Sequence, residues 1–297
     1  MTSQETETSL ASAPPHISES RRFFRVFFSR KIVVFGLVVI IALAIMAIFA
    51  NILAPYDPYK QDLTNIAALP SHDHLLGTDS IGRDILSRVI FGSRTAFLVG
   101  IVGVCLAATI GVTLGLIAGY FGGIVNTIIM RLTEVLMAFP MIVLALSLAS
   151  ILGPGIQNVV IALGIANAAG YIRVMNGMTM SLKENDYILA GKSMGSSGLR
   201  IMLRHILPNS FAPIIVVVTL QIGFMILAEA SLSYLGIGIQ PPSAAWGAMV
   251  AEGYRYLTSN PVLSFAPGIA IMLVVFAFNL VGDGLRDALD PRLRGLI

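Results

Sequence analysis

The chain has 297 residues, of which 56% are hydrophobic and only 12% are charged, whereas soluble domains carry about 25% charged residues. This composition, with a mean hydropathy of +0.84, excludes a soluble globular enzyme and a disordered chain. The net charge of +3 is too mild for a nucleic-acid partner, so we expect an integral membrane protein surrounded by lipid.

Residues 1–30 are polar at their start and are expected to form a cytoplasmic tail. The first apolar run, Ile32–Leu53, is longer than the 7–15 apolar residues of a cleavable signal, so we expect a retained transmembrane helix over residues 31–53. Five later runs approach the roughly 20 residues that a helix needs to cross a membrane. They are Ala96–Tyr120, Val135–Leu152 with a start as early as Ile124, Ile156–Ile172, Phe211–Ile239 and Val262–Val281. Each run is continuous rather than alternating, which predicts an all-α membrane protein with six transmembrane helices.

Most of the 19 Lys and Arg residues fall on one side of these runs. They are Arg21, Arg22, Arg25, Arg30 and Lys31 before the first run, Arg131 after the second, Arg173, Lys183, Lys192, Arg200 and Arg204 after the fourth, and Arg286, Arg292 and Arg294 after the sixth. Because basic loops stay in the cytoplasm, both termini are predicted to be cytoplasmic, with residues 284–297 as a C-terminal tail.

The loop over residues 54–95 is predicted to lie outside the cell membrane and to end in an amphipathic helix. Ile85, Val89 and Ile90 fall on one face of that helix, and Arg83 and Arg88 fall on the other. We expect this helix to lie on the outer membrane surface. Its start is expected to be capped by the side chain of Asp79 or Ser80.

Small residues recur every four positions in the second run, at Gly111, Gly115 and Gly119. In lipid, close backbone approach through small residues drives helix association. The row predicts tight packing on another helix, either within this chain or in a partner subunit.

Glu229 is a carboxylate inside the fifth run. It lies about 27 Å along a straight helix from Phe211, which places it near the outer interface. We expect a structural or gating contact there, and a proton or ion relay is the alternative.

The cytoplasmic loop over residues 174–209 is predicted to contain two short helices, Tyr187–Met194 and Leu199–Leu207. Gly195 to Gly198 form the bend between them, and Pro208 is expected to end the second helix. Ile201, Leu207 and the bend are expected to expose apolar or small residues outside the membrane, which indicates docking to another protein.

This segment resembles the coupling loop of ABC importer permeases, whose pattern is E-A-A, three residues, G, nine residues, I-x-L-P. Ala190, Gly195, Leu207 and Pro208 match that pattern at the right spacing. The chain departs from it in three places, because Leu189 replaces Glu, Gly191 replaces the second Ala and His205 replaces Ile.

Further motifs resemble the second, C-type permease of the dipeptide/oligopeptide/nickel importer family. They are His74–Asp79, Gly82-Arg83-Asp84, Ser87-Arg88, Gln240-Pro241-Pro242, Trp246-Gly247, Phe278-Asn279-Leu280, Gly282–Asp287 and Leu289-Asp290-Pro291. They occur in the expected order over residues 30–292.

The resemblance implies a type I importer permease fold, with residues 96–283 as the transmembrane domain and a cytoplasmic coupling helix, in a bacterial inner membrane. It implies a homologous permease as partner, two ATPase subunits that bind ATP and Mg, and an extracytoplasmic peptide-binding protein. The residues implied to couple to the ATPase are Tyr187, Leu189, Ala190, Gly191, Gly195, Gly198, Leu207 and Pro208. The implied cargo is a dipeptide or oligopeptide, with glutathione, an opine, an antimicrobial peptide or nickel as alternatives. An ion-coupled secondary transporter is less favoured, since such transporters carry charged or broken helices at mid-membrane.

No catalytic residue, metal site or cofactor is expected in this chain. The sequence has no G-x-x-x-x-G-K-[ST] loop, no H-E-x-x-H and no G-x-S-x-G. Two histidines in His72-Asp73-His74 are too few for a metal site, and the single cysteine, Cys105, excludes a disulfide within the chain. The sequence thus predicts a transport subunit rather than an enzyme.

Overall fold

The structure is a computed structural model that describes residues 19–289, where every regular element is a helix. Most of the predicted N-terminal tail and the end of the C-terminal tail, residues 1–18 and 290–297, lie outside the described residues. The helices are α1 (Glu19–Ser29), α2 (Lys31–Ile48), α3 (Ala50–Leu53), α4 (Ile85–Phe121), α5 (Gly123–Met137), α6 (Met141–Leu152), α7 (Ile156–Leu182), α8 (Asp186–Ser193), α9 (Gly198–Ile201), the π-helical turn η1 (Met202–Ile206), α10 (Leu207–Tyr234), α11 (Trp246–Tyr254) and α12 (Val262–Leu289).

Five stretches of helix are long and apolar enough to cross a membrane within the described range. They are α2, α4, α7, the continuous stretch Gly198–Tyr234, and α12. The predicted third run is instead broken into α5 and α6, which meet at an angle of 90° and make a sixth span only if the bent pair counts as one. Pro140 lies at the break and caps α6; since proline has no backbone N–H, it cannot continue α5.

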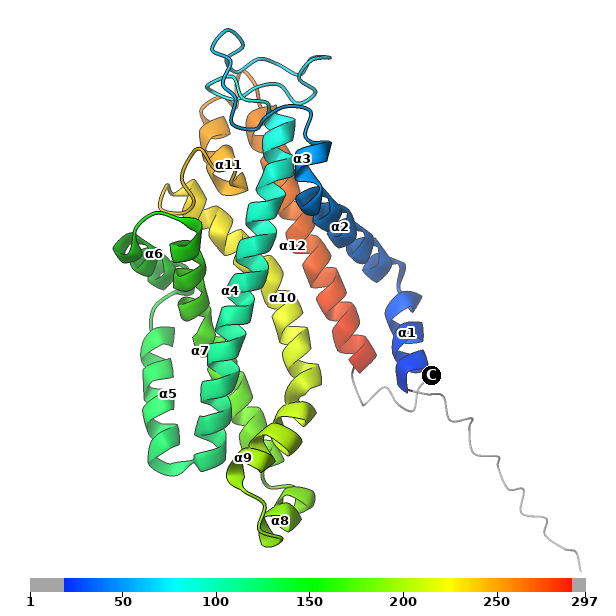
Figure 1. Ribbon diagram of the computed structural model, residues 1–297, viewed down its shortest axis with the longest axis vertical. Coiled ribbons are helices and arrows are strands. Elements are labelled where there is room, and N and C mark those ends of the chain that lie inside the picture. The colour runs from blue at the N-terminus through cyan, green and yellow to red at the C-terminus, as the bar shows by residue number, and fades with distance from the viewer. Residues whose placement is uncertain (1–18, 290–297) are drawn as a thin grey trace, which may run out of the picture.

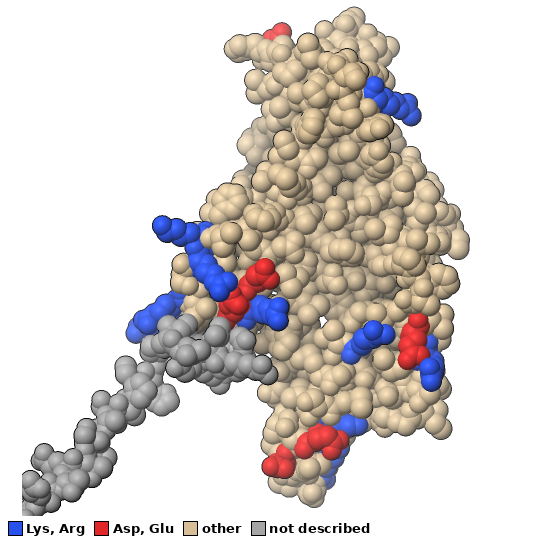
Figure 2. All heavy atoms as spheres, turned by 180° about the vertical axis from the view of Figure 1, so that it is seen from behind, with Lys and Arg blue, Asp and Glu red and all other residues tan. Residues whose placement is uncertain are grey.

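The long helices lie side by side, with the loop over residues 54–84 at one end and α8 at the opposite end (Figure 1). The main core lies where α4, α6, α7 and α10 meet, around the buried side chains of Val104, Ala145, Leu163 and Met225. Figure 2 shows a few charged side chains near the top of one face and others over its lower half, with an uncharged band between the two groups. This pattern is typical of a protein whose middle lies in hydrocarbon.

The glycine row of α4 lies against α7 of the same chain. A Cβ atom at Gly111 would lie 2.2 Å from the Cβ atom of Tyr171, and one at Gly115 would lie 2.6 Å from the carbonyl oxygen of Ile172. No side chain fits at these distances. Of the two alternatives that the sequence left open, the structure therefore shows packing within the chain.

Arg94 of α4 closes the break between α2 and α3. Its guanidinium donates to the carbonyl oxygens of Ala47 at 2.6 Å and Ile48 at 3.0 Å, and to the side-chain oxygen of Asn51 at 2.9 Å. These carbonyls lie where the helix changes direction, so one side chain both satisfies them and fastens the first span to α4.

The prediction of a separate amphipathic helix on the membrane surface is wrong. Residues 85–90 form the first turns of α4, which continues without a break to Phe121. The cap is Asp84, which accepts a hydrogen bond from the backbone N–H of Ser87 at 2.8 Å, rather than Asp79 or Ser80. The polar face is buried, with Arg88 only 2% exposed. Hydrophobic periodicity could not reveal this, because protein rather than water covers that face.

Candidate functional site

The segment Asp186–Ile206, hereafter the elbow, contains α8, α9 and η1 and projects from the end of the molecule opposite the loop over residues 54–84 (Figure 1). Its bend depends on Gly195, whose φ of +80° lies in the left-handed region that favours glycine. The backbone N–H of Gly195 donates to the carbonyl of Lys192, and that of Ser196 donates to the carbonyl of Gly191. After the bend, the Ser197 hydroxyl caps α9. Two backbone hydrogen bonds and the Ser197 cap therefore stabilise the turn that reverses the chain.

The inner side of the elbow is apolar and anchored on two long helices. Ile188 and Ile201 are each 1% exposed and Ile206 is fully buried. They belong to one apolar cluster with Leu116 of α4 and Met175 of α7. These three buried side chains connect the elbow to both long helices. The expectation that Ile201 is exposed is wrong, since this residue faces the bundle.

The outer side of the elbow is also apolar, and it is exposed. Tyr187 is 46% exposed, Leu189 44%, Met194 80%, Leu199 63% and Leu203 51%. An apolar surface of this kind outside the membrane is typical of a protein interface. Sequence reasoning did not single out Met194, Leu199 and Leu203. Leu199 and Leu203 are four residues apart, and this helical spacing could have placed them on one face.

The predicted coupling residues divide into exposed and covered positions. Tyr187, Leu189, Ala190, Gly195 and Pro208 are exposed, Gly198 and Leu207 are half-buried, and Gly191 is buried. The exposed positions are available for contact with another protein. Gly191 instead contributes its carbonyl oxygen to the bend.

Pro208 does not end the second helix of the elbow, as the sequence suggested. It lies in the first turn of α10, and the helical path runs without a gap from α9 through η1 into α10. In the π-helical turn the backbone N–H of Leu207 bonds to the carbonyl of Met202, five residues back. This wider turn accommodates a residue that has no N–H to donate. The elbow is therefore continuous with a membrane-spanning helix.

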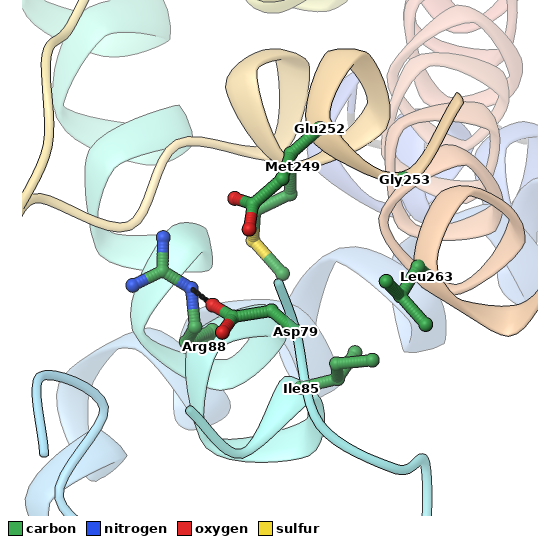
Figure 3. Close-up of a pocket in the computed structure, with 7 residues that line it drawn as sticks. All are labelled: Asp79, Ile85, Arg88, Met249, Glu252, Gly253 and Leu263. Atoms are coloured by element: carbon green, nitrogen blue, oxygen red, sulfur yellow. Dashed lines mark ion pairs between the residues drawn. The ribbon is translucent and has the colours of Figure 1, made fainter. Parts of the chain in front are cut away.

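At the opposite end, buried charges fasten the loop over residues 54–84 to α11 (Figure 3). Asp79 accepts from the Nε atom of Arg83 at 2.5 Å, and Arg88 lies 3.4 Å from the same carboxylate. Glu252 of α11 pairs with Arg83 at 3.3 Å and accepts from the hydroxyl of Ser80. Asp79, Arg83 and Arg88 are each at most 5% exposed. Burying these groups is costly unless they are paired, so the loop has one preferred position on the helices.

Asp62 lies on the exposed part of the same loop. Hydrogen bonds from the side chains of Thr64 and Asn65 lower the pKa of Asp62 to about 2. The carboxylate is therefore ionised at neutral pH and organises a local turn.

Glu229 is 1% exposed near the end of α10. The hydroxyl of Ser233 donates to it at 2.6 Å and in turn accepts from the backbone N–H of Ile239 at 3.0 Å. This chain of bonds fastens the segment after α10 back onto the helix. Within residues 19–289, no basic side chain forms an ion pair with Glu229. The contact is structural in this conformation, and a role in gating stays a prediction.

The described residues contain no group of three or more His, Cys, Asp or Glu side chains that could hold a metal ion. Cys105 is exposed and unpaired by disulfide. His74 belongs to the His72-Asp73-His74 group, which has too few ligands for a metal site. Its Nδ1 atom lies 2.9 Å from the Asp84 carboxylate.

Comparisons with known proteins agree with the helical architecture. The family described as "Binding-protein-dependent transport system inner membrane component" matches residues 111–295. The family described as "N-terminal TM domain of oligopeptide transport permease C" matches residues 18–70.

Named relatives cover nearly the whole chain. Dipeptide transport system permease protein DppC of Alkalihalophilus pseudofirmus is 41% identical over 288 residues, which is 95% of each chain. Glutathione transport system permease protein GsiD of Pectobacterium atrosepticum is 43% identical, over 92% of this chain and 91% of the relative. Glutathione transport system permease protein GsiD of Escherichia coli O157:H7 is 43% identical, over 92% and 90%. The chain therefore belongs to the binding-protein-dependent inner membrane components, as a multi-pass, C-type permease subunit of a bacterial ABC importer.

Proposed function

We propose that this chain forms one half of a peptide-conducting pore, with a homologous permease as the other half, and that an ATPase subunit binds its elbow. The observation that carries the proposal is the two-sided character of the elbow. Its outer side exposes Leu189, Met194 and Leu199, and its inner side is buried against α4 and α7. A segment of this kind is suited to receive a movement on one side and to pass it on from the other.

In this mechanism the chain itself does no covalent chemistry. Two ATPase subunits hold ATP and Mg, and their closure moves the elbows of the two permeases toward each other. The elbow then displaces α10, with which it is continuous, and the long helices that bury its inner side. An extracytoplasmic binding protein delivers cargo to the opposite end of the pore. In this proposal both termini and the elbow lie in the cytoplasm, as the distribution of basic residues favours.

The proposed cargo is a dipeptide or short oligopeptide. The named relatives at 41% and 43% identity carry dipeptide and glutathione in their names, and both compounds are small peptides with charged ends. Glutathione is therefore the second candidate. The measurement that separates them is ATP-driven uptake of a labelled dipeptide by the complex in vesicles, with unlabelled glutathione as competitor. Inhibition by glutathione at equal concentration favours the second candidate, and no inhibition favours the first.

The elbow is tested by Leu189→Asp in the assembled complex. Leu189 is 44% exposed, so the change leaves the fold intact but places a charge where an apolar partner surface is expected. We expect ATP-dependent uptake to fall by about tenfold or more, since the few hot-spot residues at the centre of an interface cost about 2 kcal/mol or more when they are lost. Binding of the loaded binding protein to the complex should not change.

The matched control is Leu189→Met, which keeps an apolar side chain of similar volume and should retain uptake. Normal uptake by Leu189→Asp, with the ATPase still bound, would contradict the role given to the elbow.

A further inference from the structure

A second apolar surface lies beside the elbow, at the turn between α4 and α5. The segment Tyr120–Ile124, hereafter the hairpin tip, reverses the chain through Gly122 and Gly123, whose φ angles are +65° and +49°. Phe121 is 61% exposed and Ile124 is 78% exposed. The tip is held in place by Lys183, whose Nζ atom donates to the carbonyl of Gly119 at 3.2 Å. These large apolar side chains are therefore presented on a fixed turn.

A charged pair on α5 indicates that the hairpin tip lies beyond the hydrocarbon. Arg131 and Glu134 form an ion pair of 2.8 Å, and their side chains are 76% and 48% exposed. Exposed charges of this kind are expensive in the bilayer core. Ile124 lies about 10 Å further along the helix than Arg131, at the end that carries the elbow (Figure 1). Phe121 and Ile124 are therefore on the aqueous side of the pair, where exposed apolar side chains are unfavourable unless a partner covers them.

The hairpin tip is continuous with the elbow through Tyr120. A Cβ atom at Gly198 would lie 2.9 Å from the Tyr120 ring, so the start of α9 rests directly on this aromatic side chain. The ammonium group of Lys192 lies 5.6 Å from the centre of the same ring. On the other side, the rings of Tyr120 and Phe121 meet edge to face at 5.3 Å. One apolar surface thus extends from the elbow to the hairpin tip.

We propose that the hairpin tip is a second contact for the ATPase subunit that binds the elbow. This inference rests on the proposed function, because the occupant follows from continuity with the elbow. A partner that covers Leu199 on the elbow is placed to cover Phe121 as well, since Gly198 and Phe121 both touch Tyr120. Two separate points of contact prevent the ATPase from turning about the elbow. Its movement then reaches α4 and α5 directly, in addition to α10.

The test is site-directed crosslinking in the assembled importer. Single cysteines are introduced in a Cys105→Ser background at Ile124, at Leu189 in the elbow, and at Val135 as the control, and each is labelled with a photoactivatable maleimide. Val135 is 60% exposed and lies on the same face of α5 as Ile124, three turns higher and beyond the charged pair. We expect Ile124→Cys and Leu189→Cys to crosslink to the ATPase subunit, and Val135→Cys not to do so.

The outcomes separate this inference from the proposed function. Crosslinking at Leu189 without crosslinking at Ile124 overturns the second contact and leaves the elbow as the only one. Crosslinking of Ile124 to the partner permease or to lipid also overturns it. Failure at both positions contradicts the proposed function itself.

A binding measurement adds a quantity to the same test. Ile124→Ser removes an apolar side chain that is already exposed in this chain, so the fold is not affected. We expect the affinity of the ATPase for the permease pair to fall by about tenfold, as for the loss of one buried aliphatic side chain. Val135→Ser should leave that affinity unchanged. Equal affinities for Ile124→Ser and the unmodified complex would contradict the contact.

Discussion

Gly115 illustrates at the residue scale how a missing side chain determines the packing of two helices. A Cβ atom there would lie 2.6 Å from the carbonyl oxygen of Ile172 and 2.8 Å from the Cβ atom of Met175. One neighbour is a backbone atom of α7 and the other is a Cβ atom attached directly to that backbone, so neither can move without moving the helix. The helices must separate if the glycine is replaced.

We therefore expect Gly115→Ala to destabilise the protein by about 1–3 kcal/mol, the usual cost of overpacking. The measurement is thermal unfolding of the purified complex in detergent. Gly177→Ala is the control, because a Cβ atom at Gly177 would have no atom within 4 Å in this chain. An unchanged melting temperature for Gly115→Ala would show that α4 and α7 are less closely packed than the structure indicates.

The glycine spacing was informative from sequence alone, but its partner was not. A small residue at every fourth position shows that something approaches closely. Only the structure shows that the approaching helix is α7, since the spacing of the glycines does not indicate which helix packs against them.

At the scale of elements, the loop over residues 54–84 behaves as part of the helical body. Asp79 and Arg83 are buried in this loop. Arg83 also pairs with Glu252 of α11, which lies 169 residues further along the sequence. Local patterning assigned Arg83 and Arg88 to a water-facing side, because a charged residue is exposed by default. The distant carboxylates reverse that expectation.

We expect Glu252→Gln to release the loop from α11 by weakening charge-assisted hydrogen bonds, at a cost of about 2 kcal/mol. Arg83 is 4% exposed in the intact protein, so trypsin should cleave after Arg83 only when the loop opens. The measurement is the rate of that cleavage in the purified protein, which should rise in the variant. The control is Glu134→Gln, whose surface ion pair contributes little. Equal cleavage rates in Glu252→Gln and the unmodified protein would show that the other bonds of the loop suffice.

The elbow combines local features that the sequence predicts with a helical continuity that it does not predict. Its two helices and the glycine bend were predictable, because Gly195 and Ser197 are strong local signals. The continuity of α9, η1 and α10 was not, since a proline usually marks an end. The π-helical turn before Pro208 depends on tertiary contacts, because the burial of Ile206 and Met202 stabilises the wider turn.

At the scale of the whole molecule, two chemically different ends flank an apolar middle. One end is tied by buried ion pairs, and the other presents the elbow and the hairpin tip (Figure 1). This division agrees with the proposed function, in which a cargo-delivering protein binds one end of the permease and an ATPase binds the other.

This orientation predicts the result of a topology experiment. A reporter fused after residue 70 should be active only outside the cytoplasm, and one fused after residue 297 only inside it, because most basic residues lie on the elbow side. The measurement compares alkaline phosphatase with a cytoplasmic fluorescent reporter at both positions. Reversed signals would place the elbow outside the cell and remove the basis for ATPase binding.

The sequence by itself determined that lipid surrounds this protein. It also determined the number and approximate position of the apolar runs and the location of the bend at Gly195. These properties follow from composition and short-range spacing. The tertiary structure decided that Pro140 breaks the third run, that α7 receives the glycines of α4, and which side of the elbow is buried. The physical reason is that each of these depends on which surfaces meet, and that is fixed by residues far apart in the chain.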